Sequence, residues 1–230
     1  MLKAFGPNIW IAEGPMVEAA AGFHYPTRMA VIRLTNGDLV LWSPTALSDN
    51  LRAEVGALGT VRYLVAPNSL HHTFLGDWQR AYPDAKVYAP PSLPEKRTDI
   101  RFDAIFSDGP VAEWAGEIDH AIMWGNRITT EVVFFHRESR TAIFTDLIQQ
   151  FPRGWFRGWR ALVARLDLMV AEEPAVPRKF RVAFTDRRAA RQSLQRVLTW
   201  PTDKVVIAHG PLISNDGQAF LRRTFRWLAD

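Results

Sequence analysis

The chain of 230 residues contains no cysteine. This absence excludes disulfide bonds and every metal site built on thiolates, and it leaves the redox compartment open. No apolar run approaches the ~18 residues that a membrane-spanning helix needs. The first residues, 1–7, contain no apolar signal segment with a small-residue cleavage site. We therefore expect a cytoplasmic protein without a transmembrane segment.

Nucleotide-binding motifs are also missing. No Gly-x-Gly-x-x-Gly follows a predicted strand and no P-loop is present, which argues against a dinucleotide-binding or nucleoside-triphosphatase fold. Neither a repeat nor a linker nor a low-complexity tract divides the chain, and hydrophobic residues make up 47% of it. Length and composition together predict a single domain spanning residues 1–230.

The net charge of +4 is unevenly distributed. Residues 151–200 hold eleven Lys/Arg and four Asp/Glu residues, a local net charge of +7. Two interpretations of this charge stay open. The stretch forms either a solvated arginine-rich face or a surface that attracts an anionic ligand, a membrane surface or a nucleic acid. We find no strong nucleic-acid signal. Apolar residues between Trp155 and Leu166 fall largely on one helical stripe. That stripe fits a core-packed helix, a cover over an active site, a dimer face or a membrane-surface helix.

Several short apolar runs predict strands, and longer periodic stretches predict helices. The predicted strands are residues 8–12, 29–34, 38–42, 61–66, 86–89, 118–124, 131–135, 142–145 and 205–208, and the predicted helices are residues 47–58, 73–82, 155–170, 186–200 and 219–229. Ser43 or Thr45 is expected to cap the first helix, and Asn36-Gly37 is a good hairpin turn. Mixed hairpins and helices fit an α/β (α+β) protein with two sheets face to face and helices outside.

Three of the predicted strands are followed by side chains that can bind a metal ion. His71 and His72 follow the apolar run 61–70, Asp146 follows the run 141–145, and His209 follows the run 204–208. Imidazole and carboxylate groups are the usual ligands of zinc and non-haem iron. We therefore expect these side chains to meet at one edge of a β-sandwich.

These features resemble the metallo-β-lactamase fold superfamily over most of residues 8–210. The segment Phe144-Thr-Asp146 is similar to the Gly-Asp turn of that family, and Ala208-His-Gly210 to its last His-Gly ligand. The resemblance implies an αββα sandwich with a metal site at one sheet edge. The overall pattern is similar to an uncharacterised branch of the superfamily.

The metal-binding motif departs from the family pattern. The family loop His-x-His-x-Asp-His aligns with Pro67-Asn-Ser-Leu-His-His72, so Pro67 and Ser69 stand at its first two histidines. The segment Gly125-Asn-Arg127 stands where the family has its middle histidine. The resemblance thus implies that the first of two metal sites is lost. The second keeps His71, His72, Asp146 and His209, a set suited to one divalent ion, zinc first and iron or manganese as alternatives.

The resemblance implies a metal-dependent, hydrolase-like protein. Asp146 would orient or deprotonate a metal-bound water, and Arg127, if it occupies the position of the missing ligand, would pair with an anionic group of a small-molecule substrate. The alternative is a non-catalytic relative that uses the same polar cluster structurally and binds a partner through its basic stretch. A nuclease is less favoured because the nuclease branches keep both metals. His24, His120 and His136 are interpreted as surface or hydrogen-bonded core histidines. Substrate and oligomeric state are left open.

Overall fold

The structure, a computed structural model, describes residues 1–229. The side chains of β9 (Glu131–His136) alternate between the two faces of its sheet and show how the layers of the protein are built. Val132 and Phe134 pack between the two sheets, whereas Val133 and Phe135 pack under helices. Because successive side chains of a strand point to opposite faces, a strand that is apolar throughout requires cover on both faces. Full burial of a side chain such as Phe134 contributes roughly 1.5–3 kcal/mol.

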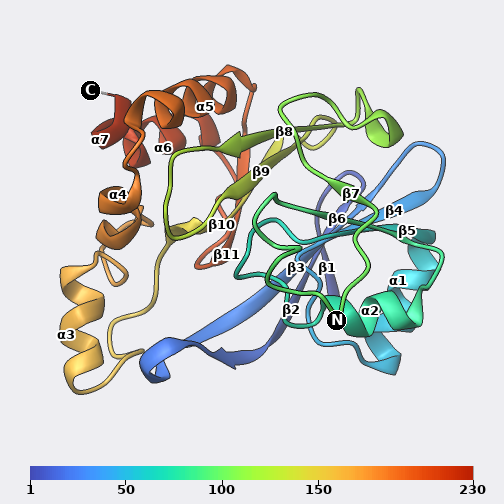
Figure 1. The fold of residues 1–230 in the computed structure, drawn as a ribbon, viewed down its shortest axis with the longest axis horizontal. Helices are drawn as coiled ribbons and strands as arrows, with labels where there is room; N and C mark the ends of the chain where they lie inside the picture. Colours follow the sequence, from blue (N-terminus) through green and yellow to red (C-terminus); the bar gives the residue numbers. More distant parts are fainter. Residues whose placement is uncertain (230) are drawn as a thin grey trace.

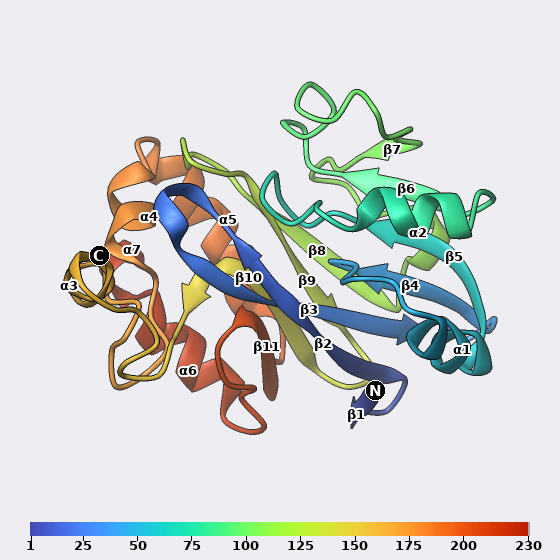
Figure 2. The ribbon, with the colours of Figure 1, turned by 90° about the horizontal axis from the view of Figure 1, so that it is seen from below.

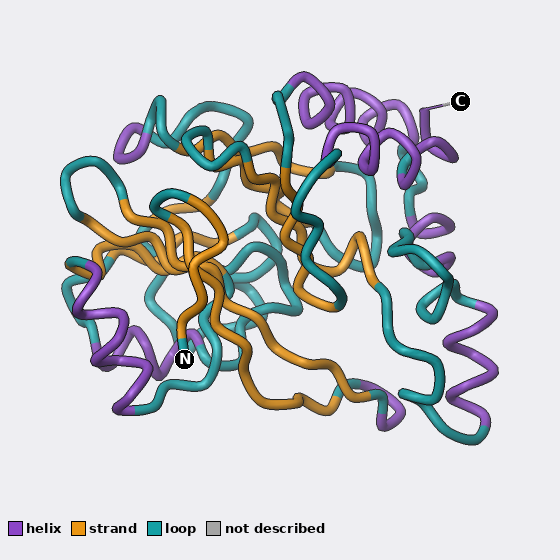
Figure 3. Tube along the Cα trace, turned by 180° about the vertical axis from the view of Figure 1, so that it is seen from behind, coloured by secondary structure: helices purple, strands orange, loops and turns teal. Residues whose placement is uncertain are grey.

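The first sheet places its strands side by side in chain order. The strands are β1 (Leu2–Gly6), β2 (Ile9–Glu18), β3 (His24–Arg33), β4 (Asp38–Trp42), β5 (Thr60–Val65), β6 (Lys86–Ala89) and β7 (Ala104–Ile105). The strands β1 to β4 are antiparallel, and β5 to β7 continue parallel to β4. The tip of the β2–β3 hairpin, which carries the short 3-10 helix Ala20–Gly22, reaches away from this sheet toward the helix α3 (Trp159–Leu166) (Figure 3).

The second sheet has the order β11-β10-β9-β8. Its other strands are β8 (Ile118–Met123), β10 (Thr141–Gln149) and β11 (Lys204–His209). The strands β8, β9 and β10 are antiparallel neighbours, and β11 lies parallel to β10. β10 pairs with β11 up to Phe144 and again at Gln149, with a register shift between. The prediction that this strand ends at residue 145 is therefore wrong, because it continues through Asp146 as an irregular segment.

Helices cover the outer faces of both sheets. They are α1 (Asp49–Leu58), α2 (Leu75–Ala81), α3 (Trp159–Leu166), α4 (Arg178–Ala183), α5 (Arg187–Thr199), α6 (Gly217–Thr224) and α7 (Arg226–Ala229), with a further 3-10 helix at Ala112–Trp114. Figures 1 and 2 show α1 and α2 on one side and α5, α6 and α7 on the other, with the sheets between. The expected αββα sandwich is confirmed. None of the helices in the described part of the chain has the length and apolar character needed to cross a membrane.

Local signals explain where the helices differ from expectation. Ser48, rather than Ser43 or Thr45, caps α1 by accepting the amide hydrogen of Leu51. The helix expected over residues 155–170 begins only at Trp159, because Gly158 before it has φ 58° and interrupts the helical backbone. The helix expected over 219–229 is divided into α6 and α7, and α4 was not predicted.

Candidate metal centre

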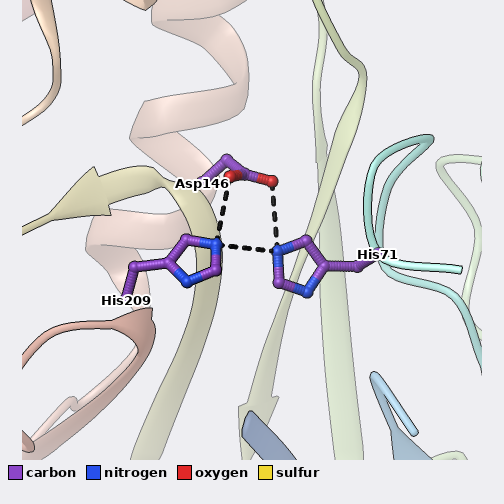
Figure 4. Close-up of side chains that lie close together, drawn as sticks. All are labelled: His71, Asp146 and His209. Atoms are coloured by element: carbon purple, nitrogen blue, oxygen red, sulfur yellow. Dashed lines mark hydrogen bonds and ion pairs between the residues drawn. The ribbon is translucent and has the colours of Figure 1, made fainter. Parts of the chain in front are cut away.

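Three side chains from distant parts of the chain converge beside the two sheets. His71 comes from the loop after β5, Asp146 from the irregular part of β10, and His209 ends β11. One ligand-type atom from each lies within 4.8 Å of the other two (Figure 4). His71 Nε2 is 3.2 Å from His209 Nε2, and the Asp146 carboxylate oxygens are 3.3 and 3.4 Å from these nitrogens. Ligands of one ion with bonds of about 2.0–2.2 Å have such separations.

A backbone carbonyl fixes which nitrogen of His209 faces this group. Nδ1 of His209 donates to the carbonyl oxygen of Pro26 at 2.9 Å. A carbonyl only accepts, so Nδ1 carries the hydrogen and the neutral ring has its lone pair on Nε2. Arg28 supports this end of β11 by donating to the carbonyl oxygens of Ile207 and Gly210. A metal-binding histidine is held in this way when its second nitrogen donates to an oxygen.

Asn68 couples the position of His71 to that of Asp146. Its side-chain oxygen accepts the backbone N–H groups of Leu70 and His71 at 2.8 and 2.9 Å, which closes a tight turn. Its side-chain nitrogen donates to Asp146 Oδ2 at 2.7 Å and to Thr145 Oγ1 at 2.8 Å. The Oγ of Ser43 lies 2.9 Å from Nδ1 of His71. Ser43 adopts φ 51° without being glycine, a strained conformation of the kind found at functional sites.

Asp146 is ionised although it is buried. Burial alone raises the pKa of a carboxyl group, but the imidazoles of His71 and His209 oppose this and hold the pKa of Asp146 well below its ordinary value. Burial lowers the pKa of His209, which keeps that ring neutral, the form that binds a metal. Gln149 donates a further hydrogen bond to Asp146 at 3.2 Å. One carboxylate and two imidazoles therefore form a donor set that suits a divalent cation.

Glu131 holds the irregular part of β10 in place. This residue is fully buried, and its carboxylate accepts the backbone N–H groups of Thr145, Asp146 and Leu147 at 2.8–3.0 Å. The register shift releases these amides from the ladder, and the carboxylate takes the place of a strand partner. Burial, together with the charge of Asp146, raises the pKa of Glu131.

His72 is not part of the group, although it was expected there. Its Nδ1 lies 2.8 Å from Nη1 of Arg97, which also donates to the carbonyl oxygen of His72. Burial, assisted by Lys96 and Arg97, lowers the pKa of His72 to about 4. Successive residues of a turn point in different directions, and here the turn made by Asn68 directs only His71 toward Asp146. The expected convergence of four side chains thus holds for three.

The residues that align with the other histidines of the family motif make structural contacts. The Pro67 carbonyl accepts the N–H of Val132, and Ser69 Oγ lies 3.2 Å from Thr129 Oγ1. Lys96 donates to the Ser69 carbonyl at 2.8 Å. Gly125, with φ 86°, lies so close to the backbone of Asp186 that any side chain would collide with it. None of these contacts presents an imidazole or a carboxylate.

The other polar residues singled out in the sequence lie elsewhere. Asp119 forms a two-pronged ion pair with Arg137 at 2.7 Å, and His120 Nε2 donates to the carbonyl of Ser107. His136 is buried and bonded to Ser139, and His24 is exposed. Arg127 is exposed, and the cavity beside the three converging side chains is lined by its neighbour Ile128 rather than by Arg127.

That cavity, which we call the site cavity, has a volume of about 320 Å³. Its lining includes Ser43, Tyr25 and the cations Lys96 and Lys179, with Glu18 as an acidic neighbour. Burial, followed by the charges of two carboxylates, raises the pKa of Tyr25, so this residue keeps its hydrogen at neutral pH. Small-molecule sites commonly have such a volume and a few convergent polar groups.

Solved structures of the same fold span the whole chain. A metallo-β-lactamase from Pontibacter korlensis matches 100% of this chain and 99% of its own, with 14% identity and a TM-score of 0.65. The metallo-β-lactamase FIM-1 from Pseudomonas aeruginosa in its mono-zinc form matches 100% and 92%, with 11% identity and a TM-score of 0.61. The metal-soaked Flv1 flavodiiron core from Synechocystis sp. PCC6803 matches 100% and 60%, with 12% identity and a TM-score of 0.64. The protein has the metallo-β-lactamase fold.

Residues 8–161 match the family model described as "Domain of unknown function (DUF4336)". The chain belongs to this family. The matched region contains His71 and Asp146 but ends before His209. No curated protein matches the sequence significantly.

Sequence reasoning missed three residues that shape the site, Asn68, Glu131 and Gln149. Asn68 lies within the aligned motif, so its ability to form an Asx turn was a usable signal. Glu131 lies at the start of a predicted strand, where a charged residue normally marks the solvent end. The sequence around Glu131 contains no feature that distinguishes an exposed charged residue at a strand end from a buried carboxylate.

Proposed function

We propose that this protein is a metal-dependent hydrolase with one divalent cation, zinc in the first place, held by His71, Asp146 and His209. The observation that carries the proposal is the convergence of these three groups, with the Nε2 lone pair of His209 directed into the group by Pro26. In support, a protein of the same fold is known in a mono-zinc form. His72 is left out of the ligand set because its ring nitrogen contacts Arg97.

A divalent ion at this position supplies Lewis acidity and lowers the pKa of a bound water. The chain itself supplies orientation and charge. Asp146 accepts the hydrogen of the attacking water, whose oxygen forms the new bond to the substrate. The proton then passes to the leaving oxygen as its bond breaks. Tyr25, which stays protonated, is available to donate a hydrogen bond to the substrate, and Lys179 and Lys96 attract an anionic group.

Metal content tests the proposal. The purified protein, stripped and then titrated with Zn²⁺, is expected to hold about one equivalent. Asp146→Asn loses the charge that balances the cation, and His209→Ala loses a ligand, so both are expected to lower affinity more than a hundredfold. His136→Gln, a buried histidine outside the group, serves as the control and should bind as the wild type does. Hydrolysis of a panel of carboxylic and phosphoric esters is then assayed to find which class is a substrate. The activity must disappear when the metal is removed by a chelator.

A non-catalytic role is the second candidate. It is favoured by Pro67 and Ser69, which align with two histidines of the family motif and instead form hydrogen bonds with Val132 and Lys96. In that case the reconstituted protein contains no ion, remains folded and hydrolyses nothing. Two equivalents of zinc would contradict both candidates as stated.

A further inference from the structure

A second hollow of the surface opens directly beside the site cavity. This hollow, which we call the apolar groove, has a volume of about 640 Å³. Ala19, Tyr25 and Lys179 line both it and the site cavity, so the two spaces share a wall. The two spaces therefore adjoin one another at these three residues.

Apolar side chains dominate the far part of the groove. Phe23 comes from the β2–β3 hairpin, Val163 and Leu166 from α3, Met169 from the segment after α3, and Val182 from α4. The exposed fractions of Val163, Leu166 and Val182 are 41%, 58% and 79%. Exposure of apolar surface to water is unfavourable in free energy, and contact with an apolar ligand would remove that surface from water.

Hydrogen bonds hold the walls of the groove without any ligand. Arg178 donates to the carbonyl of Leu166 at 2.8 Å, and Asp167 accepts the N–H of Lys179, so the end of α3 is fixed against the start of α4. Arg160 donates to the carbonyl of Ala21 at 2.7 Å, which ties the hairpin tip to α3. A preformed groove binds a chain-like ligand with less loss of entropy than a mobile surface does.

Positive charge lies where the two spaces meet. The ammonium of Lys179 is 3.4 Å from Asp167 and 3.5 Å from the Tyr25 hydroxyl, at the shared wall. Lys96 also lines the site cavity, as does the acidic residue Glu18. The polar end therefore favours an anionic or ester head group, and the apolar end favours a hydrocarbon chain.

From this arrangement, and resting on the proposed hydrolase function, we infer that the substrate is an amphiphile with an acyl chain. The chain lies in the apolar groove and the hydrolysable ester lies beside Asp146. Hydrolysis breaks the acyl C–O bond, forms one C–O bond from water, and transfers the proton of the water to the leaving alcohol. The two spaces together fall in the size range of small-molecule sites.

Calorimetric titration with sodium butyrate, hexanoate, octanoate and decanoate tests the groove. Each buried methylene contributes about 0.8 kcal/mol, roughly a fourfold gain, so a partly open groove should give about two- to fourfold per methylene. Leu166→Glu should weaken decanoate at least tenfold. Leu162→Glu is the matched control, because Leu162 lies on the same helix, is 59% exposed and does not line the groove. It should change affinity less than twofold.

The outcomes separate this inference from the proposed function. If the affinity for the carboxylates does not depend on their chain length, in metal-loaded and chelator-treated protein alike, the apolar groove does not bind the chain. This result overturns the inference even if esters are hydrolysed. Chain-length dependence that persists in a metal-free, inactive protein upholds the groove although the hydrolase proposal fails. If both variants lose binding to anionic vesicles equally, the surface binds a membrane and the inference is overturned. If decanoate does not bind and Leu166→Glu changes the protein from dimer to monomer, the surface binds a second copy of the chain, which also overturns the inference.

Discussion

The two sides of the site cavity are built from different kinds of contact. On the side formed by Asp146 and His209, every polar group has a neighbour that fixes its direction. On the side lined by Lys96, the adjoining residues Pro67 and Ser69 do not line the cavity and use their polar atoms in hydrogen bonds within the protein, one of them with the ammonium of Lys96. One side thus presents free ligand atoms and the other presents a fixed positive charge.

The side formed by Asp146 and His209 is held in place independently of Pro67 and Ser69. The ligand-bearing side is supported from beneath by Glu131 and from the loop by Asn68, and neither support passes through Pro67 or Ser69 side chains. A divalent cation needs a negative counter-charge, which Asp146 offers beside the two imidazoles. Lys96 would repel a second cation on its own side, so the comparison favours one ion rather than two.

The largest effect is expected from Glu131→Ala, which removes the support of the ligand-bearing side. Three buried N–H groups lose a charged acceptor, so the free energy of unfolding should fall by at least about 3 kcal/mol. Urea unfolding measures it. Glu131→Gln keeps one acceptor oxygen and should lose about half as much, and the exposed Glu138→Ala should lose less than about 0.5 kcal/mol. Equal effects at residues 131 and 138 would contradict the assigned role.

The second effect separates two neighbouring histidines. His71→Ala removes a proposed ligand and should lower zinc affinity more than about 100-fold, beyond the ~10–100-fold typical of outer-shell changes. His72→Ala, one residue away, should lower it less than about tenfold because its ring contacts Arg97. Competition with a chromogenic chelator measures both. A larger loss for His72 would restore it to the ligand set.

The same contrast shows what the sequence can and cannot predict. The expected meeting of His71, Asp146 and His209 is observed, although only His209 ends a strand, while Asp146 lies in the irregular part of β10 and His71 in the loop after β5. The expectation failed for His72, since the direction of a side chain in a turn depends on the Asn68 hydrogen bonds rather than on spacing. A motif read as a row of letters cannot distinguish these neighbours.

The fold followed from periodicity where burial was one-sided or uniform, as in α1 and β9. It was less accurate where a buried polar residue or a glycine altered the backbone. The run 142–145 predicted a short strand, but the carboxylate of Glu131 satisfies the amides of an irregular segment and β10 reaches Gln149. Such a partner comes from a different strand, so no local window of sequence reveals it.

A smaller effect is expected in the pH dependence of stability. His72 has a pKa of about 4 in the folded protein and about 6.5 when unfolded. Between these values the unfolded chain binds a proton that the folded one does not. Stability is therefore highest above pH 6.5 and falls as the pH drops toward 4. After allowance for partial exposure, the contribution is about 1–2 kcal/mol. Urea unfolding at pH 7 and pH 4.5 should show a shallower decline for His72→Gln than for the wild type, and parallel declines would refute this origin.

The smallest effect is expected from Asp119→Asn, a change on β8 before the segment Gly125-Asn-Arg127. The carboxylate of Asp119 is paired with Arg137 in an ion pair that is partly open to water, and such pairs contribute about 0.2–1 kcal/mol. The variant should therefore unfold at slightly lower urea concentration, and the difference should shrink in high salt because exposed ion pairs are screened. Its zinc stoichiometry should remain that of the wild type. If Asp119→Asn instead lost zinc while Arg137→Ala did not, Asp119 would be acting as a ligand rather than as a surface partner. The proposal of one ion held by His71, Asp146 and His209 would then have to be revised.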